Sequence, residues 1–250
     1  MTFTNFSIIL FIGITAGFIN VNAGGGSLLT IPALIFIGLP PAMANGTNRI
    51  ALSIANIVAI FNFKKKGFFN WKLSLFLAIP ASIGAILGSL ISIKLPANIY
   101  NSILAIVIIF VIIVIIVDPR RFIKKDVTKD IINNKILSLI IFFFLGIYGG
   151  IIQAGAGFLI ITSLLFLTGY SLTRINSIKV IIAFIYMFFS IIVFVISGNI
   201  NWIYAIILSI GNGVGAYFGS LFAIKHGDTW IKIILIIMAF LMALKLLKVF

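Results

Sequence analysis

The sequence predicts an all-α polytopic membrane protein. Hydrophobic residues make up 62% of its 250 residues and charged residues only 9%, whereas soluble domains average about 45–50% apolar and about 25% charged. A soluble fold of this length could not bury so much apolar surface. The apolar segments run to about twenty residues, the length of a helix that crosses a bilayer, and this length argues against a β-barrel.

The first half contains five expected helical segments, of which the second is short. An apolar helix over 3–21 ends at a break rich in asparagine and glycine, and a short helix over 27–37 stops before Pro40. Helices are then expected over 43–63, 72–93 and 96–117. Trp71 fits an interfacial anchor. The pair Gly84 and Gly88 forms a GxxxG-type face for close helix packing.

The second half repeats this order after a charged segment. Residues 118–135 hold three of the four acidic residues and are predicted to be a basic cytoplasmic linker between a first transmembrane repeat, 1–117, and a second, 136–250. The second repeat is expected to have a helix to 152, a break, a short helix over 158–167 and a helix over 173–196. A helix after Trp202, a loop at 225–228 and a last helix to 249 complete it.

An offset of 131 residues relates the two halves. It places Asn70-Trp71 on Asn201-Trp202, and it places Gly84 and Gly88 on Gly215 and Gly219. Chance similarity between apolar segments would match leucines and isoleucines, but rarely this set of Asn, Trp and Gly. The sequence therefore indicates an internal duplication.

Loop charge favours inverted over parallel repeats. Lys64-Lys65-Lys66 in the first half corresponds to the uncharged loop 197–201 in the second, as the positive-inside rule would produce if equivalent loops faced opposite sides. If the short helix crosses the membrane or returns as a hairpin, each half has an odd number of passes and the second half is inverted. The alternative is eight spans in two parallel four-helix repeats.

Glycines interrupt the helices at equivalent places in both halves. Gly24-Gly25-Gly26 follows the first helix, and Gly155 and Gly157 follow its counterpart. Glycine allows the backbone to leave the helix, and unwound backbone at membrane depth survives only where it is buried in protein or lines a cavity. We expect the two breaks to meet and to line a site, although a tight helix crossing would also use glycines.

Two charged residues are expected well inside long spans, and both are cationic, one in each half. Arg49 and Lys179 lie shortly after the two breaks, and none of the acids falls within a span. Intramembrane charge is functional by default, although Arg49 could also reach toward the headgroups from a helix end. With the partial positive charge of helix N-termini, these side chains predict an anion site. Its expected substrate-binding residues are Asn20, Asn22, Gly24, Gly25, Gly26, Asn45, Thr47, Asn48, Arg49, Gln153, Gly155, Gly157, Asn176, Ser177 and Lys179.

Composition argues against several other classes of function. The net charge of +14 lies mostly between apolar spans, where it sets topology, so a nucleic-acid partner is not expected. The chain has no cysteine, and no cluster of metal ligands or catalytic residues is visible. We expect no catalytic residue, no metal and no cofactor. The expected partners are a small anion and membrane lipids, and a homo-oligomer is compatible with the sequence.

The glycine break and the step that follows it resemble the TauE/SafE sulfite exporter family of membrane transporters. The family pattern is a triple glycine, a proline step and an A-x-G-T element, duplicated. The first copy matches at Gly24–Gly26, Pro32 and Ala44–Thr47. The second copy is looser, because it lacks the triple glycine and the Gly-Thr pair and has Lys179 in place of Arg49. The resemblance covers essentially the whole chain.

The resemblance implies a secondary transporter in the cytoplasmic membrane. Sulfite or organosulfonates are the expected substrates, export is the expected direction, and alternating access is the expected mechanism. An anion-selective channel and a carrier of small carboxylates remain the alternatives. Direction, coupling ion and oligomeric state stay open on the sequence alone.

Overall fold

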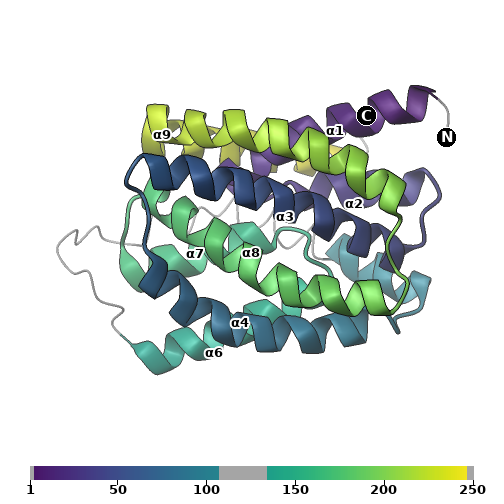
Figure 1. Cartoon of the computed structure of the whole chain (residues 1–250), viewed down its shortest axis with the longest axis horizontal. Coiled ribbons are helices and arrows are strands. Elements are labelled where there is room, and N and C mark those ends of the chain that lie inside the picture. The colour runs from purple at the N-terminus through teal and green to yellow at the C-terminus, as the bar shows by residue number, and fades with distance from the viewer. Residues whose placement is uncertain (1–2, 107–133, 247–250) are drawn as a thin grey trace.

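The protein is a bundle of long helices, as Figure 1 shows for the computed structural model. The structure describes residues 3–106 and 134–246, and the side chains of 6–106 and 134–226 within them. The described residues contain no strand, so the all-α prediction is confirmed. Residues 97–106 are also helical. The main helices are α1 Phe3–Ala23, α2 Ser27–Phe36, α3 Pro41–Lys65, α4 Trp71–Ser92, α6 Lys135–Ile151, α7 Ala156–Thr168, α8 Leu172–Ile196 and α9 Trp202–Leu246.

The structure corrects one expected element and describes another only in part. The prediction of a loop at 225–228 is wrong, because α9 is helical without interruption from Trp202 to Leu246. The helix expected over 96–117 is seen as far as residue 106. The rest of that helix and nearly all of the expected linker, 118–133, lie outside the described residues.

The first two helices form a hairpin rather than one continuous span. Gly24 takes a φ of 73° at the break, a left-handed conformation that glycine adopts without steric cost. One apolar cluster joins Ile9 near the start of α1 to Leu34 near the end of α2 and to Ala44 near the start of α3. The start of α1 and the end of α2 therefore lie at the same end of the bundle (Figure 1).

Equivalent helices of the two halves run in opposite directions. Gly46 near the start of α3 lies against Phe194 near the end of α8, while Ser53 and Asn56 in the middle of α3 contact Met187. Figure 1 shows α3 and α4 antiparallel to their counterparts α8 and α9. This is the arrangement expected of inverted repeats. The side of a membrane that each loop faces stays a prediction.

The two halves pack against each other through their first and last helices. The last long helix described in each half lies along the first helix of the other half: α4 packs on α6, and α9 packs on α1. A Cβ on Gly84 would lie 2.1 Å from the carbonyl oxygen of Phe143, and one on Gly215 would lie 1.9 Å from that of Ile14. The small residues predicted for helix packing therefore allow backbone-to-backbone contact.

The outer surface of the bundle is apolar. Large hydrophobic side chains are exposed along several helices, among them Phe11, Phe36, Ile79, Phe144 and Ile196. By length and composition, four helical stretches of the described chain could each cross a membrane: 6–23, 71–92, 172–196 and 202–226. This surface fits contact with lipid acyl chains rather than water.

The Asn-Trp motifs open equivalent helices. The side chain of Asn70 accepts a hydrogen bond from the Leu73 N–H, and that of Asn201 accepts one from the Tyr204 N–H. Asparagine is a favoured N-cap. The adjacent Trp71 and Trp202 are about half exposed, which is compatible with the interfacial position predicted for them.

Positive charge gathers at one end of the bundle. Lys65 ends α3, Lys72 lies in the first turn of α4, Lys135 begins α6 and Arg174 lies in the first turn of α8. Figure 1 shows these helix ends on its left side. The positive-inside rule therefore predicts that this end faces the cytoplasm.

The tight break at Gly24 leads to a stability prediction. A Cβ there would lie 2.2 Å from the carbonyl carbon of Gly157, whereas one on Gly67, which has a similar φ of 79°, would meet no atom within 4 Å. Both alanine variants carry backbone strain, but only Gly24→Ala also overpacks the core. We expect Gly24→Ala to be less stable than Gly67→Ala by about 1–3 kcal/mol. Thermal unfolding of the purified variants in one detergent measures this, and equal losses would contradict the contact.

Candidate functional site

The two glycine breaks meet inside the bundle. A Cβ on Gly157 would lie 2.6 Å from the Cα of Gly24, so the two backbones are in direct contact. Ser27, the first residue of α2, donates to the carbonyl oxygen of Gln153 at 3.2 Å and accepts from the N–H of Gly155 at 3.3 Å. The prediction that the two stretches come together is therefore correct.

The end of α6 is capped by side chains from the first half. The Arg49 guanidinium donates to the carbonyl oxygens of Gly149 and Gly150 at 2.8 and 2.7 Å. The Asn45 amide, one helical turn earlier on α3, donates to the carbonyl oxygen of Ile151 at 2.8 Å. The last carbonyls of a helix have no partner within it, so these bonds satisfy three groups where the helix breaks.

The end of α1 is capped in the same way by the second half. The Lys179 ammonium donates to the carbonyl oxygens of Asn20 and Val21 at 2.6 and 2.8 Å. The Asn176 amide donates to the carbonyl oxygen of Asn22 at 3.2 Å. An offset of 129 residues maps these three acceptors onto the three on α6. Each half therefore caps the broken helix of the other with one cation and one asparagine.

The caps explain why a membrane interior holds these two cations. Arg49 and Lys179 are almost completely buried, and each faces the partially negative C-terminal end of a helix. Arg49 also lies over the ring of Phe194, with Cζ 4.8 Å from the centroid. The cations therefore have a structural role that the sequence did not show. Their predicted role in binding an anion is separate from it and stays a prediction.

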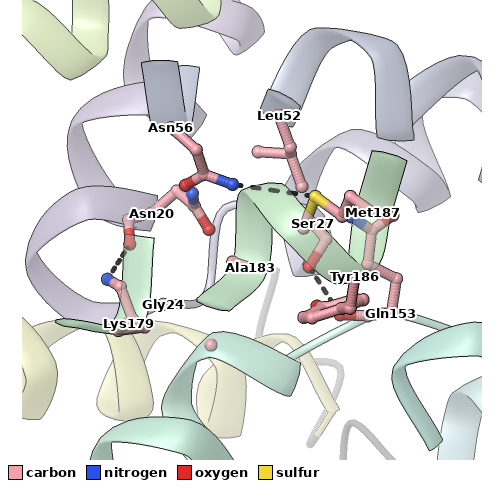
Figure 2. A pocket seen from close by; sticks show the side chains of 11 residues that line it. Asn20, Gly24, Ser27, Leu52, Asn56, Gln153, Lys179, Ala183, Tyr186 and Met187 are labelled. Atoms are coloured by element: carbon pink, nitrogen blue, oxygen red, sulfur yellow. Dashed lines mark hydrogen bonds between the residues drawn. The ribbon is translucent and has the colours of Figure 1, made fainter. Parts of the chain in front are cut away.

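A pocket opens between the halves beside the crossing of the breaks, and Figure 2 shows the side chains around it. The space between atoms in and around it is about 270 Å³, part of it open to the outside, and its narrow interior has room for only about one water molecule. None of its lining residues is acidic. They are Asn20, Gly24, Ser27, Leu52, Asn56, Gln153, Gly157, Lys179, Ala183, Tyr186 and Met187.

The structure places only part of the predicted site at this pocket. The predicted residues that line it are Asn20, Gly24, Gln153, Gly157 and Lys179. The predicted residues that do not line it are Asn22, Gly25, Gly26, Asn45, Thr47, Asn48, Arg49, Gly155, Asn176 and Ser177.

Several of the residues outside the pocket hold helices together. The Thr47 hydroxyl accepts from the N–H of Asn201, just before α9. The Asn48 amide donates to the Gln153 side chain, and the Asn22 amide donates to the carbonyl oxygen of Gly219 on α9. Ser177 bonds back to its own helix. A close approach explains Gly26, where a Cβ would lie 2.4 Å from the carbonyl oxygen of Ala16.

Sequence reasoning missed the wall of the pocket formed by α3 and α8. Asn56 follows Arg49 by seven residues, while Tyr186 and Met187 follow Lys179 by seven and eight. Residues at these spacings share a helix face. A polar residue two turns beyond a buried cation, on the same face of a mainly apolar span, was the signal that could have identified Asn56.

Gln153 holds an unusual backbone conformation at the edge of the pocket. Its φ of 63° is the only positive value at a non-glycine residue in the described chain. Such conformations persist where the surroundings impose them, and they cluster at functional sites. The Gln153 side chain is buried and points into the pocket (Figure 2).

Comparison with known proteins shows the family. The model described as "Sulfite exporter TauE/SafE" matches residues 9–246. The chain therefore belongs to this family, and the resemblance found in the glycine break is confirmed.

Relatives of similar length carry names of the same class. A "Probable membrane transporter protein" of Haemophilus influenzae is 28% identical over 96% of this chain and 93% of its own. "Probable membrane transporter protein ORF9" of a Sinorhizobium species is 27% identical over 93% and 88%. "Probable membrane transporter protein YfcA" of Escherichia coli K12 is 25% identical over 96% and 88%. No solved structure matches the chain.

The family and the apolar bundle together define a class of protein. The chain is a membrane transporter and an integral protein of the cell membrane. The family and the names of the relatives indicate a role in transport.

Because Arg49 and Lys179 cap equivalent helix ends, we predict that a lysine at position 49 can also cap α6. Lys179 shows that an ammonium can hold two helix-end carbonyls, so Arg49→Lys should keep most of the stability. Arg49→Met leaves the carbonyls of Gly149 and Gly150 without a donor, and each such group costs about 1–3 kcal/mol. Thermal unfolding should show a large loss in Arg49→Met and a small one in Arg49→Lys. Equal stability of Arg49→Met and the unmodified protein would refute the cap.

The backbone conformation of Gln153 leads to a further stability prediction. Both Gln153→Ala and Gln153→Gly remove the hydrogen-bonding side chain, but only glycine adopts the left-handed conformation without steric strain. We expect Gln153→Gly to be more stable than Gln153→Ala by about 1 kcal/mol. Parallel thermal melts measure the difference. An alanine variant as stable as the glycine variant would show that the left-handed conformation is not maintained.

Proposed function

We propose that the protein is a secondary transporter of small anions, with sulfite or organosulfonates as substrates, export as its direction and alternating access as its mechanism. The observation that carries the proposal is a buried lysine in a pocket without acids. Lys179 lines the pocket, no lining residue is acidic, and a cation carrier would need a carboxylate there.

Neutral hydrogen-bond donors support an anionic substrate. The amides of Asn56 and Gln153 and the hydroxyl of Tyr186 line the same pocket as Lys179. A charged donor with several neutral ones matches the oxygens of a sulfite, sulfonate or carboxylate group. The starts of α2 and α7 reach the pocket at Ser27 and Gly157, and helix N-termini add partial positive charge.

The narrow pocket, lined by buried residues, favours a carrier over a channel. A channel keeps a continuous path in its open state, whereas this pocket is buried between the halves and narrow. Halves that run in opposite directions and meet at broken helices are the plan by which many secondary transporters expose one site to either side. The family description favours a sulfur oxyanion, and small carboxylates are the rival substrates.

A thermal-shift screen with the purified protein tests the proposal. The ligands are sulfite, sulfate, sulfoacetate, taurine and small carboxylates, because any ligand that binds the folded state raises its melting temperature. We expect a shift with sulfite or a sulfonate and none with potassium or sodium ions at equal ionic strength. The proposal would be overturned if only a cation raised the melting temperature, or if none of the anions did.

Matched variants then locate the site. Lys179→Met and Arg49→Met each remove one helix cap, but only Lys179 lines the pocket. We expect the anion-induced shift to disappear in Lys179→Met and to persist in Arg49→Met and in the surface variant Lys65→Met. If Arg49→Met also abolishes the shift, Arg49 belongs to the anion site as the sequence predicted. If Lys179→Met retains it, the pocket is not the site.

Counterflow in liposomes separates the two mechanisms. A carrier exchanges labelled for unlabelled anion across the membrane faster when substrate is present on both sides, and its flux saturates. We expect saturable counterflow of the anion that gives the thermal shift. A linear, ohmic current would instead identify a channel.

A further inference from the structure

Three buried hydrogen-bond donors converge on the sulfur of one methionine. The Sδ of Met187 lies 3.3 Å from Gln153 Nε2, 3.7 Å from Asn56 Nδ2 and 3.9 Å from Ser53 Oγ. These donors come from α3 and from the break before α7, while Met187 lies on α8. Figure 2 shows the Asn56 amide pointing across toward the sulfur of Met187, with Gln153 on the Met187 side.

The acceptor in this cluster is weaker than its donors. A thioether sulfur is a poor hydrogen-bond acceptor, whereas amide and hydroxyl donors bond strongly to oxygen. Asn56 and Gln153 are almost fully buried and Ser53 is nearly so, and buried donors without a good acceptor are costly. In addition, the hydroxyl of Tyr186, which lines the same pocket, has no partner among the described residues.

We propose that Met187 occupies the place of a substrate oxygen and that it is the residue that selects oxyanions. In the structure its sulfur lies among the three donors. When the anion binds, the methionine side chain rotates away, and an oxygen of the substrate accepts the hydrogen bonds of Asn56, Gln153 and Ser53. This inference rests on the proposed function and identifies how the same pocket recognises its ligand.

The position of Met187 relative to Lys179 supports this division of roles. Both residues line the pocket from α8, on one face of the helix two turns apart. The substrate then needs a negative charge near Lys179 and an oxygen acceptor near the donor cluster. Methionine is unbranched and flexible, so it can leave the donors without a movement of the backbone.

This arrangement selects a chemical class. Sulfite and sulfonates carry several oxygens on one small centre, and such oxygens accept hydrogen bonds well from the donor cluster, while the negative charge lies in the same pocket as Lys179. A halide carries the charge but offers no such oxygen. We therefore expect sulfur oxyanions to displace Met187 and chloride not to displace it at the same ionic strength.

The NMR signal of the Met187 methyl group would report the displacement of this side chain by the anion. The chain has five methionines, so a sample labelled with ¹³C at the methionine methyl groups gives a simple NMR spectrum, in which Met187→Leu identifies the Met187 signal. Titration of the full-length protein in detergent with sulfite or sulfoacetate should move that signal and leave the Met43 signal in place. Chloride should move neither.

Variants of the donors supply a second readout. Asn56→Leu removes one donor at nearly constant volume and should weaken sulfite binding by roughly ten- to hundredfold. Asn62→Leu is the matched control, because Asn62 lies on the same helix but bonds to Tyr217 and Ser220 on α9. It should bind sulfite as the unmodified protein does. Met187→Ala should leave space for larger sulfonates and bind them several-fold more tightly than the unmodified protein.

The outcomes separate this inference from the proposed function. If no anion binds to the unmodified protein, the proposed function fails and the inference fails with it. If sulfite binds and the Met187 signal does not move, or if Asn56→Leu and Asn62→Leu bind equally well, only the inference fails. A shift of the Met187 signal by chloride equal to that by sulfite would also overturn it.

Discussion

The structure depends on the reciprocal capping of two broken helices. A helix that ends inside a membrane leaves its last carbonyls without partners, and water is not there to replace them. Here the α1 carbonyls accept from Lys179 and Asn176, and the α6 carbonyls accept from Arg49 and Asn45. Because each cap comes from the opposite half, neither broken helix is satisfied without the other half. Folding and assembly of the two halves are therefore coupled.

The same exchange explains the distribution of small residues. α4 lies on α6 and α9 lies on α1, with glycines at the contacts, and the two breaks touch at Gly24 and Gly157. These contacts bring backbones close enough for side chains of one half to reach carbonyls of the other. A relative movement of the halves would also move the capped helix ends, and the capped end of α1 borders the pocket at Asn20. The pocket therefore lies at the interface between the two halves.

The pocket departs from the symmetry of the fold that forms it. An offset of 131 residues places Asn56 on Met187, so an amide and a thioether face each other where equivalent helices meet. Likewise, Lys179 lines the pocket whereas Arg49 does not, and the second break has Gln153 with positive φ where glycine would be the simplest choice. A duplicated scaffold therefore presents one charged side and one neutral donor side. This asymmetry is the basis of the proposal that the pocket binds a small oxyanion.

The sequence alone determined the class of fold and the two breaks, because apolar length, glycine runs and a repeated Asn-Trp-Gly pattern are local properties of the chain. It also identified the two buried cations Arg49 and Lys179, and it named Gly24, Gln153 and Lys179, which line the pocket. Only the tertiary structure decided what the cations contact, because their acceptors are carbonyls about 100 and 160 residues away in the chain, and carbonyls have no sequence signature. Likewise, Asn56 and Met187 became pocket residues only once α3 was placed antiparallel to α8. Polar contacts between distant helices depend on how the helices are oriented and packed, and helical periodicity does not specify either.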